Sequence, residues 1–229
     1  MAGKIPEYMK RGCTVTESEF SMLAKNVCSN VEPDGQYKLD FPKEKADGQK
    51  KTIVVNLFAG PGAGKSTGAC YVFSRLKMIG LDCEYVSEFA KDKVWEHNEE
   101  VLKCQFYISG KQAYKISRVY GKVDVIITDS PILLGALYGE ETSPKLKDAI
   151  KEEFGKYYNL NFFINRVKEY NPNGRMQTLD EAKAIDDRMK EMLESYGRDS
   201  YMSVDGSAEG YEMIIERVAE ELMRIRNNC

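Results

Sequence analysis

A glycine-rich loop between a predicted strand and a predicted helix carries the strongest chemical signal in the 229-residue sequence. It reads Ala59-Gly60-Pro61-Gly62-Ala63-Gly64-Lys65-Ser66-Thr67. The spacing is that of the P-loop or Walker A motif, with Ala59 at a first position where the pattern has glycine. Glycines let the backbone approach a phosphate without an intervening Cβ. We expect the N–H groups of residues 60–66, except that of Pro61, to point at phosphate oxygens beside a helix N-terminus.

The polar side chains of this loop have separate expected roles. Lys65 should reach the β- and γ-phosphates, the Ser66 hydroxyl should ligate Mg²⁺, and the Thr67 hydroxyl should lie near the α-phosphate. The loop therefore predicts a site for ATP and Mg²⁺.

A second polar position follows an apolar strand. The run 123–128, VDVIIT, is followed directly by Asp129. Strand ends of a parallel sheet face the ligand crevice, so Asp129 can hold Mg²⁺, directly or through water, or orient a nucleophile.

Strands and helices alternate along residues 51–229. Strands are predicted over 52–58, 82–87, 123–128, 160–164 and 201–204. Helices are predicted over 65–79, most of 89–121, 178–196 and 208–226. This alternation predicts an α/β fold in three layers (α/β/α), with helices on both faces of a five-stranded parallel sheet. The P-loop after its first strand leads us to expect a fold of the P-loop NTPase type. Residues 1–50 are predicted to form an extension, with a short helix over 16–28 and an irregular connector.

Several residues after the second strand have side chains suited to an acceptor. Glu88 ends that strand beside the P-loop, where a carboxylate can act as a general base. The helical region 89–122 offers aromatic rings for stacking, amides for base edges and a cation. These candidates are Trp95, Gln105, Tyr107, Gln112 and Arg118. An amphipathic helix with an aromatic core explains each of them equally well.

A basic segment follows the fourth strand. Arg166 and Arg175 flank the turn-forming sequence Asn-Pro-Asn-Gly. Guanidinium groups make forked bonds to phosphate, so residues 166–177 are expected to form a mobile lid over the phosphates. The charged helix over 178–196 that comes next is typical of a solvated surface.

Composition excludes several classes of protein. Lys and Arg number 33 against 36 Asp and Glu, giving a net charge of −3, which disfavours a strongly basic nucleic-acid clamp. One histidine makes a Ser-His-Asp triad hard to build. The sequence lacks a CxxC pair, an apolar signal core and an apolar run of about 18 residues. We therefore expect a cytoplasmic protein with free thiols and no membrane partner.

Together, FAGPGAGKST, EYVSEFAKD, residues 105–118, VDVIITDSP and the basic lid resemble P-loop nucleoside and nucleotide kinases. The similarity is to the ribosylnicotinamide-kinase-like group, many of them phage-encoded, which would place this chain in a bacterial host cytoplasm. A looser likeness to deoxynucleoside kinases maps their acid, Trp and Gln onto Glu88, Trp95 and Gln105, whereas Ser130 replaces their arginine. The resemblance covers about residues 52–226. It implies strand order 2-3-1-4-5, ATP, Mg²⁺ and an acceptor site under helices 89–121.

Three functions remain open. The first is transfer of the ATP γ-phosphoryl group to a nucleoside-like small molecule by a monomer or homodimer, with either Glu88 or Asp129 as base. The second is a kinase acting on DNA, at a hydroxymethylated pyrimidine or a strand end. Its cations would be Lys103, Lys111, Lys115, Arg118 and Lys122. The third is an ATPase or switch without a small acceptor. We do not expect specificity for GTP, because INRVKEYN after the fourth strand lacks the motif by which GTPases read the guanine base. An AAA-type motor would need a larger chain.

Overall fold

The computed structural model describes residues 50–138, 142–171, 178–197 and 199–227. The helix and connector expected within residues 1–49 lie outside the described residues. Across the described ranges, every helix is too short or too polar to cross a lipid bilayer.

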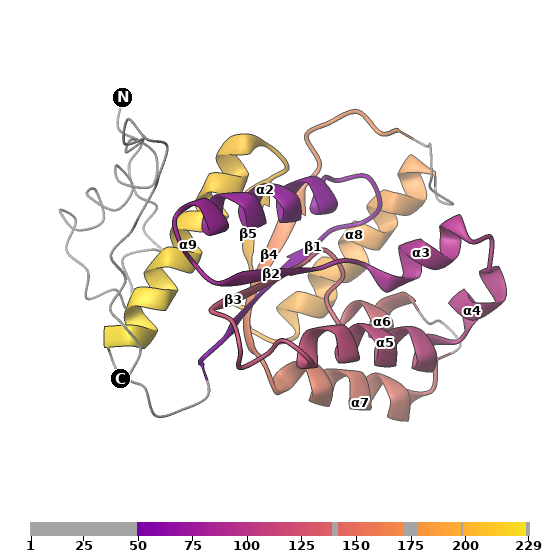
Figure 1. The fold of residues 1–229 in the computed structure, drawn as a ribbon. Coiled ribbons are helices and arrows are strands. Elements are labelled where there is room, and N and C mark those ends of the chain that lie inside the picture. The colour runs from indigo at the N-terminus through magenta and orange to yellow at the C-terminus, as the bar shows by residue number, and fades with distance from the viewer. Residues whose placement is uncertain (1–49, 139–141, 172–177, 198, 228–229) are drawn as a thin grey trace.

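Five parallel strands form one sheet in the order β2-β3-β1-β4-β5 (Figure 1). The strands are β1 (Ile53–Phe58), β2 (Cys83–Val86), β3 (Val125–Thr128), β4 (Tyr158–Asn165) and β5 (Met202–Asp205). Both the fold class and the strand order predicted from the sequence are confirmed. Every residue of the central strand β1 is buried, because helices cover both faces of a parallel sheet. Its one polar side chain, Asn56, donates to Asn159 and Asn161 of β4.

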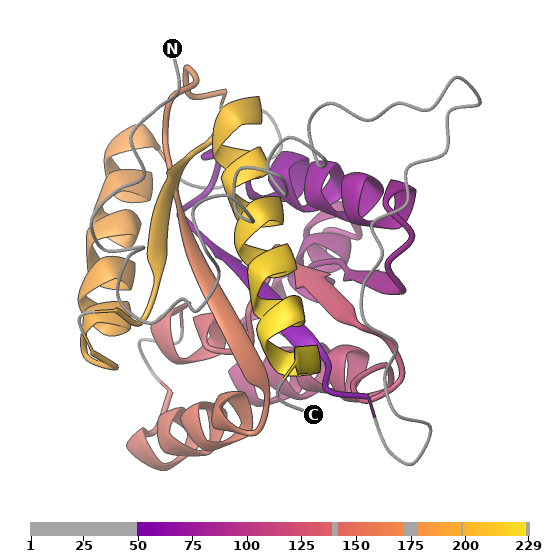
Figure 2. The ribbon, with the colours of Figure 1, turned by 90° about the vertical axis from the view of Figure 1, so that its left-hand side faces the viewer.

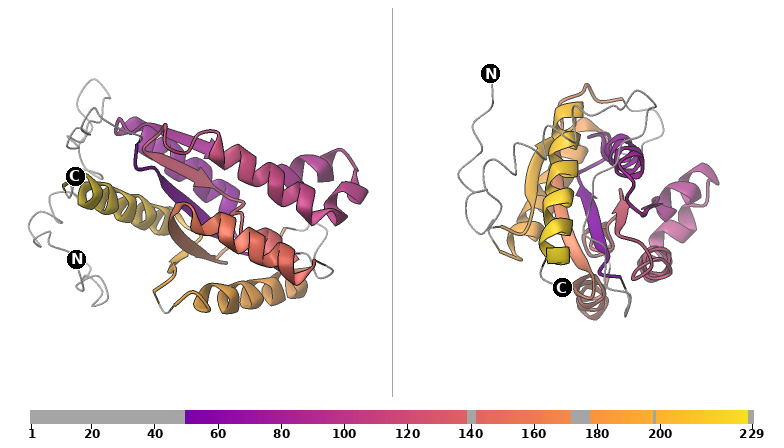
Figure 3. Two further views of the ribbon diagram at one scale, coloured as in Figure 1. Left: turned by 90° about the horizontal axis from the view of Figure 1, so that it is seen from below. Right: turned by 60° about the vertical axis from the view of Figure 1, so that its left-hand side comes forward.

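Helices cover the two faces of the sheet and form two cores. One layer holds α2 (Lys65–Met78) and α9 (Ala208–Asn227), and α9 runs along the strands in Figures 2 and 3. The other layer holds α5 (Gln105–Ser117), α6 (Leu134–Tyr138), α7 (Pro144–Gly155) and α8 (Leu179–Glu194). Alternate residues of β1 serve the two sides: Val55 packs in the first core and Val54 in the second.

The helical region after β2 is interrupted. It contains α3 (Phe89–Trp95), α4 (Glu99–Lys103) and α5, with breaks at His97, whose φ is 53°, and at Cys104. Figure 1 shows α3 and α4 beyond the sheet, on the side where β2 ends. Helices α6 and α7 lie in a stretch for which the sequence predicted no element.

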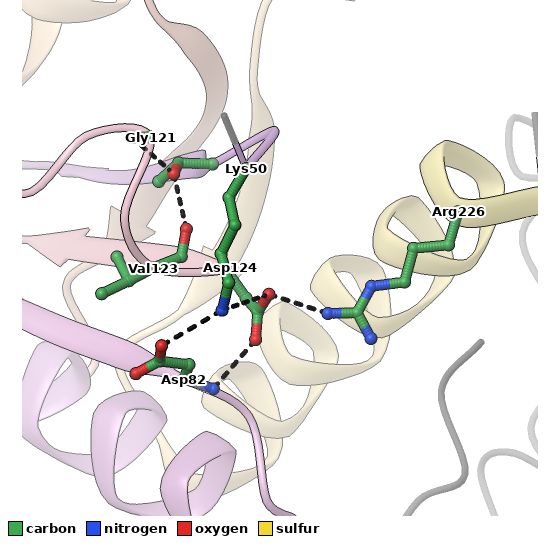
Figure 4. Close-up of polar contacts among 7 residues, drawn as sticks. Lys50, Asp82, Gly121, Val123, Asp124 and Arg226 are labelled. Atoms are coloured by element: carbon green, nitrogen blue, oxygen red, sulfur yellow. Dashed lines mark hydrogen bonds and ion pairs between the residues drawn. The ribbon is translucent and has the colours of Figure 1, made fainter. Parts of the chain in front are cut away.

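A buried carboxylate joins the chain segments at the edge where the strands begin (Figure 4). Asp124 accepts hydrogen bonds from Arg226 of α9 (2.8 Å) and from the Asp82 N–H (3.0 Å), and pairs with Lys50 (3.4 Å). The network fastens the start of β1 to the end of α9. It lies opposite the edge where β1 enters the P-loop, so it stabilises the fold away from the candidate site.

Candidate active site

The P-loop connects the end of β1 to the start of α2. Gly62 and Gly64 have φ values of 81° and 110°, in the left-handed region that glycine adopts readily. Within α2, the first turn holds no acidic residue and no side chain caps the helix. The N–H groups and positive dipole end of α2 are therefore available to an anion, as the motif predicts.

Lys65 lies folded against its own loop. Its Nζ donates to the carbonyl oxygens of Ala59 (2.6 Å) and Gly60 (3.2 Å). Burial lowers the pKa of Lys65, whereas the carboxylates of Glu88 and Asp129 act to raise it. Two carboxylates expected to be catalytic, those of Glu88 and Asp129, therefore act on the Lys65 cation.

Ser66 and Asp129 form the next part of the cluster. Ser66 Oγ donates to Asp129 Oδ2 at 2.5 Å, and the Asp129 residue is only 2% exposed. Asp129 Oδ1 is buried and has no hydrogen-bond partner in the described part of the chain. A buried carboxylate oxygen without a donor is costly, and a cation or its water would satisfy it.

This pair suits Mg²⁺, which protein sites hold through one or two side-chain oxygens together with substrate phosphates and water. The described residues contain no group of three or more His, Cys, Asp or Glu side chains placed to hold a metal. Ser66 and Asp129, with its unpartnered buried oxygen, are the residues that would hold the ion.

Glu88 stands at the end of β2, at the N-cap position of α3, and its side chain does not cap that helix. The Glu88 carboxylate is therefore not used in capping α3. Burial and the nearby Asp129 raise the pKa of Glu88, and Lys65 opposes them. A carboxylate with a raised pKa is a stronger base than an ordinary glutamate.

Arg166 reaches the P-loop, whereas Arg175 and the rest of the predicted lid from residue 172 to residue 177 lie outside the described residues. Arg166 donates to Pro61 O (2.7 Å) and to Asp186 Oδ2 of α8 (3.0 Å). Asp186 also accepts the Gly60 N–H. The sequence led us to expect that the Gly60 N–H points at a phosphate oxygen. This expectation is corrected, because the N–H donates its hydrogen bond to the Asp186 carboxylate. Asp186 likewise departs from the solvated surface expected of its helix, since its side chain is 13% exposed.

Two of the acceptor-side candidates hydrogen-bond to other residues of the protein. Gln112 is buried, accepts from Phe89 N (3.2 Å) and donates to Thr128 Oγ1 (3.4 Å), so it joins α5 to α3 and β3. Gln105 donates to the Leu102 carbonyl (2.9 Å).

Three further candidates lie at the surface. Trp95 is 66% and Tyr107 41% exposed, and Arg118 is exposed at the end of α5.

Other residues at the site were missed by sequence reasoning. Burial raises the pKa of Tyr138, with further contributions from the charges of Glu88 and Asp186. Burial and Asp129 raise the pKa of Tyr85 on β2. Tyr138 belongs to α6, an element the sequence did not reveal, whereas Tyr85 was visible three residues before Glu88.

A family model and a solved structure are similar to this chain. Residues 54–210 match a family model described as an AAA domain. A solved structure of deoxyadenosine kinase from M. mycoides with bound dATP aligns over 75% of this chain and 98% of that chain, with 15% sequence identity and a TM-score of 0.45. No curated protein matches this chain. Because the family match covers more than half of the sequence and includes the P-loop, the chain belongs to the AAA-domain family of P-loop proteins.

Proposed function

We propose that this protein is a phosphotransferase that moves the γ-phosphoryl group of ATP to a hydroxyl or phosphate of a nucleoside- or nucleotide-like acceptor. The observation that carries the proposal is the convergence of Lys65, Glu88 and the Ser66–Asp129 pair at one end of the sheet. Phosphate binding alone does not require a half-buried carboxylate beside the P-loop that neither caps its helix nor holds the metal. A kinase needs such a group for its acceptor.

Each residue would act on a different part of the reaction. The N–H groups from Gly62 to Ser66 bind the phosphates, and Lys65 exchanges the Ala59 carbonyl for phosphate oxygens. Ser66 and Asp129 would hold Mg²⁺, which neutralises charge on the phosphates when bound. Arg166 contacts Pro61 of the P-loop, and its guanidinium would stabilise the negative charge of the transferred phosphoryl group.

Glu88 is the proposed general base. It takes the proton of the acceptor hydroxyl while that oxygen bonds to the γ-phosphorus and the bond to the ADP oxygen breaks. Asp129 is less suited, because its Oδ2 is occupied by Ser66 and its Oδ1 is assigned to the ion. The narrower acceptor suggested by the resemblance, a ribosylnicotinamide, remains a prediction.

The test is Mg²⁺-dependent transfer of radiolabel from γ-labelled ATP to a panel of acceptors. The panel contains nucleosides, nucleoside monophosphates, nicotinamide riboside, and plain and hydroxymethylated DNA. Lys65→Ala should abolish transfer. Lys77→Ala is the matched control, since Lys77 is an exposed lysine of the same helix.

Label on a small acceptor, lost in Lys65→Ala and kept in Lys77→Ala, supports the proposal and names the substrate. Label on DNA alone would favour the DNA kinase. ATP hydrolysis with no labelled acceptor would contradict both kinases and favour an ATPase, a function that the AAA-domain description also covers.

A further inference from the structure

The segment that contains α5 has an unusual charge for this protein. From residue 101 to residue 123 the sequence holds no acidic side chain, although the whole chain has a net charge of −3. Its cations are Lys103, Lys111, Lys115, Arg118 and Lys122. These cations lie on α4, on α5 and just after α5, so positive charge without acidic neighbours in sequence is concentrated in one segment of the chain.

The solvent face of α5 also exposes large aromatic side chains. Phe106 is 74% and Tyr114 64% exposed, beside the partly exposed Tyr107. The opposite face of α5 carries the buried residues Ser109, Gln112 and Ile116. Packing therefore does not explain the outer aromatics, and clustered exposed apolar surface is typical of an interaction site.

Aromatic and cationic residues alternate along this outer face. Tyr107, Lys111, Tyr114 and Arg118 follow one another at steps of four, three and four residues. Such steps place side chains in a line on one side of a helix. We call these four residues the α5 stripe. Figure 1 shows α5 beside α3 and α4, in the helix layer that also contains α6 and α7.

The stripe is partly ordered by its own contacts. Lys111 Nζ lies 5.5 Å from the centroid of the Tyr107 ring, and the Tyr107 ring meets Phe89 edge-on at 5.6 Å. Among the described residues, Lys111 and Arg118 form no ion pair. Their charges are therefore not neutralised by carboxylates of the described chain.

We propose that the α5 stripe binds single-stranded nucleic acid, with phosphates on Lys111 and Arg118 and bases stacked on Tyr107 and Tyr114. Proteins that bind single strands without sequence preference combine cations that contact the phosphates with aromatic side chains on which the bases stack. An acidic protein would need only the cations. A duplex would leave the tyrosines without bases to stack on.

The stripe lies beside the proposed catalytic base. Lys115, one residue after Tyr114, donates to Ser87 Oγ (3.0 Å), and Ser87 is the neighbour of Glu88. A bound strand would therefore pass the acceptor side of the site. That the strand itself is the acceptor rests on the proposed function; the binding does not.

The experiment is fluorescence anisotropy with a labelled 20-nucleotide DNA single strand of mixed sequence, titrated at several salt concentrations. Lys111→Ala should weaken binding and lower the salt slope by about one. Tyr114→Ala should weaken binding about five- to a hundredfold and leave the slope unchanged. Melting temperatures check that each variant is folded.

Each variant has a matched control. Lys77 also lies over the ring of a residue four positions earlier, Phe73, at 5.8 Å, but on α2. Tyr196 is 45% exposed near the end of α8. Lys77→Ala and Tyr196→Ala should bind as the parent protein does. Equal losses in the stripe and control variants would overturn the proposal.

Four further results separate the alternatives. If a 20-base-pair duplex of the same sequence binds as tightly as the single strand, base stacking is overturned. If polyglutamate displaces the labelled strand as effectively as unlabelled oligonucleotide does, the stripe instead binds an acidic protein partner. Phosphorylation of a small acceptor without oligonucleotide binding would overturn the stripe alone. Oligonucleotide binding without any labelled acceptor would overturn the proposed function alone.

Discussion

The Ser66 hydroxyl donates a 2.5 Å hydrogen bond to Asp129 Oδ2, joining the first turn of α2 to the residue that follows β3. The sheet creates this contact, because β3 pairs with β1 in parallel and Asn56 lies opposite Thr128. Both strands therefore end at the same edge, and the loops that leave them meet. The pair leaves one buried carboxylate oxygen for a cation.

Asp129→Asn should separate the charge of this residue from its shape. The amide oxygen still accepts from Ser66, but the cation loses its anionic ligand. We expect Mg²⁺-dependent phosphoryl transfer to fall about a hundredfold or more, because a metal ion stabilises the transition state by several kcal/mol. ATP binding without Mg²⁺ should persist. Turnover is measured against Mg²⁺ concentration, with Asp205→Asn at the end of β5 as control; an unchanged Mg²⁺ dependence would contradict the assignment.

Glu88→Gln tests the general base through the pH dependence of the rate. The pKa of Glu88 is raised above 4.5 by burial and then by Asp129. Since the base must be ionised, kcat/KM of the parent protein should rise with pH through that raised pKa. The variant should lose about 10²- to 10⁴-fold in rate. Profiles from pH 5 to 9 decide this, and parental activity in Glu88→Gln would rule the role out.

The same pKa shift predicts how stability changes with pH. A raised pKa means that the folded protein holds the proton more tightly than the unfolded chain. The stability this provides is present below the ordinary pKa of glutamate and is lost as pH rises through the raised value. The melting temperature of Glu88→Gln relative to the parent should therefore increase from pH 4 to pH 8. Glu84→Gln, at an exposed position of β2, serves as the control variant.

Asp186→Ala should loosen the P-loop from α8. The substitution removes the acceptor of both the Gly60 N–H and one Arg166 nitrogen. Breaking a largely buried ion pair from one side leaves a charge uncompensated, so we expect the free energy of unfolding to fall by about 2–4 kcal/mol. The KM for ATP should rise as well. Asp187→Ala removes the adjacent exposed carboxylate, and equal effects of the two variants in urea unfolding would refute the link.

The sequence predicted the parts of this protein that depend on local pattern. The apolar strands 52–58 and 123–128, the P-loop and the long helices at the C-terminal end needed only periodicity and motif spacing. Helix α6 was missed because it has five residues and includes Gly135. Helix α7 was missed because its sequence, PKLKDAIKEEFG, is largely charged and buries only Ile150 and Phe154.

The candidate site was predictable to the extent that its residues lie at strand ends. Glu88 and Asp129 could be found because the residues that follow the strands of a parallel sheet gather at one edge, and Lys65 because it belongs to the P-loop motif. Asp186 could not, since it belongs to a polar helix and contacts Gly60 across 126 positions of sequence. The exposure of Tyr107 and Tyr114 was equally hidden, because the face that a helix buries depends on its tertiary partners.

Gly206→Ala should displace the P-loop without touching any polar side chain of the site. A Cβ at this position would lie 2.6 Å from the Ala63 carbonyl oxygen and 3.1 Å from that of Asn165. Both are backbone atoms, so the loop itself has to move. We expect a KM for ATP raised about tenfold or more, since small displacements of positioned groups are costly in catalysis. Gly155→Ala is the control, because its Cβ meets nothing within 4 Å. ATP affinity measured by calorimetry should fall only in Gly206→Ala, and unchanged affinity there would show that the turn after β5 does not position the P-loop.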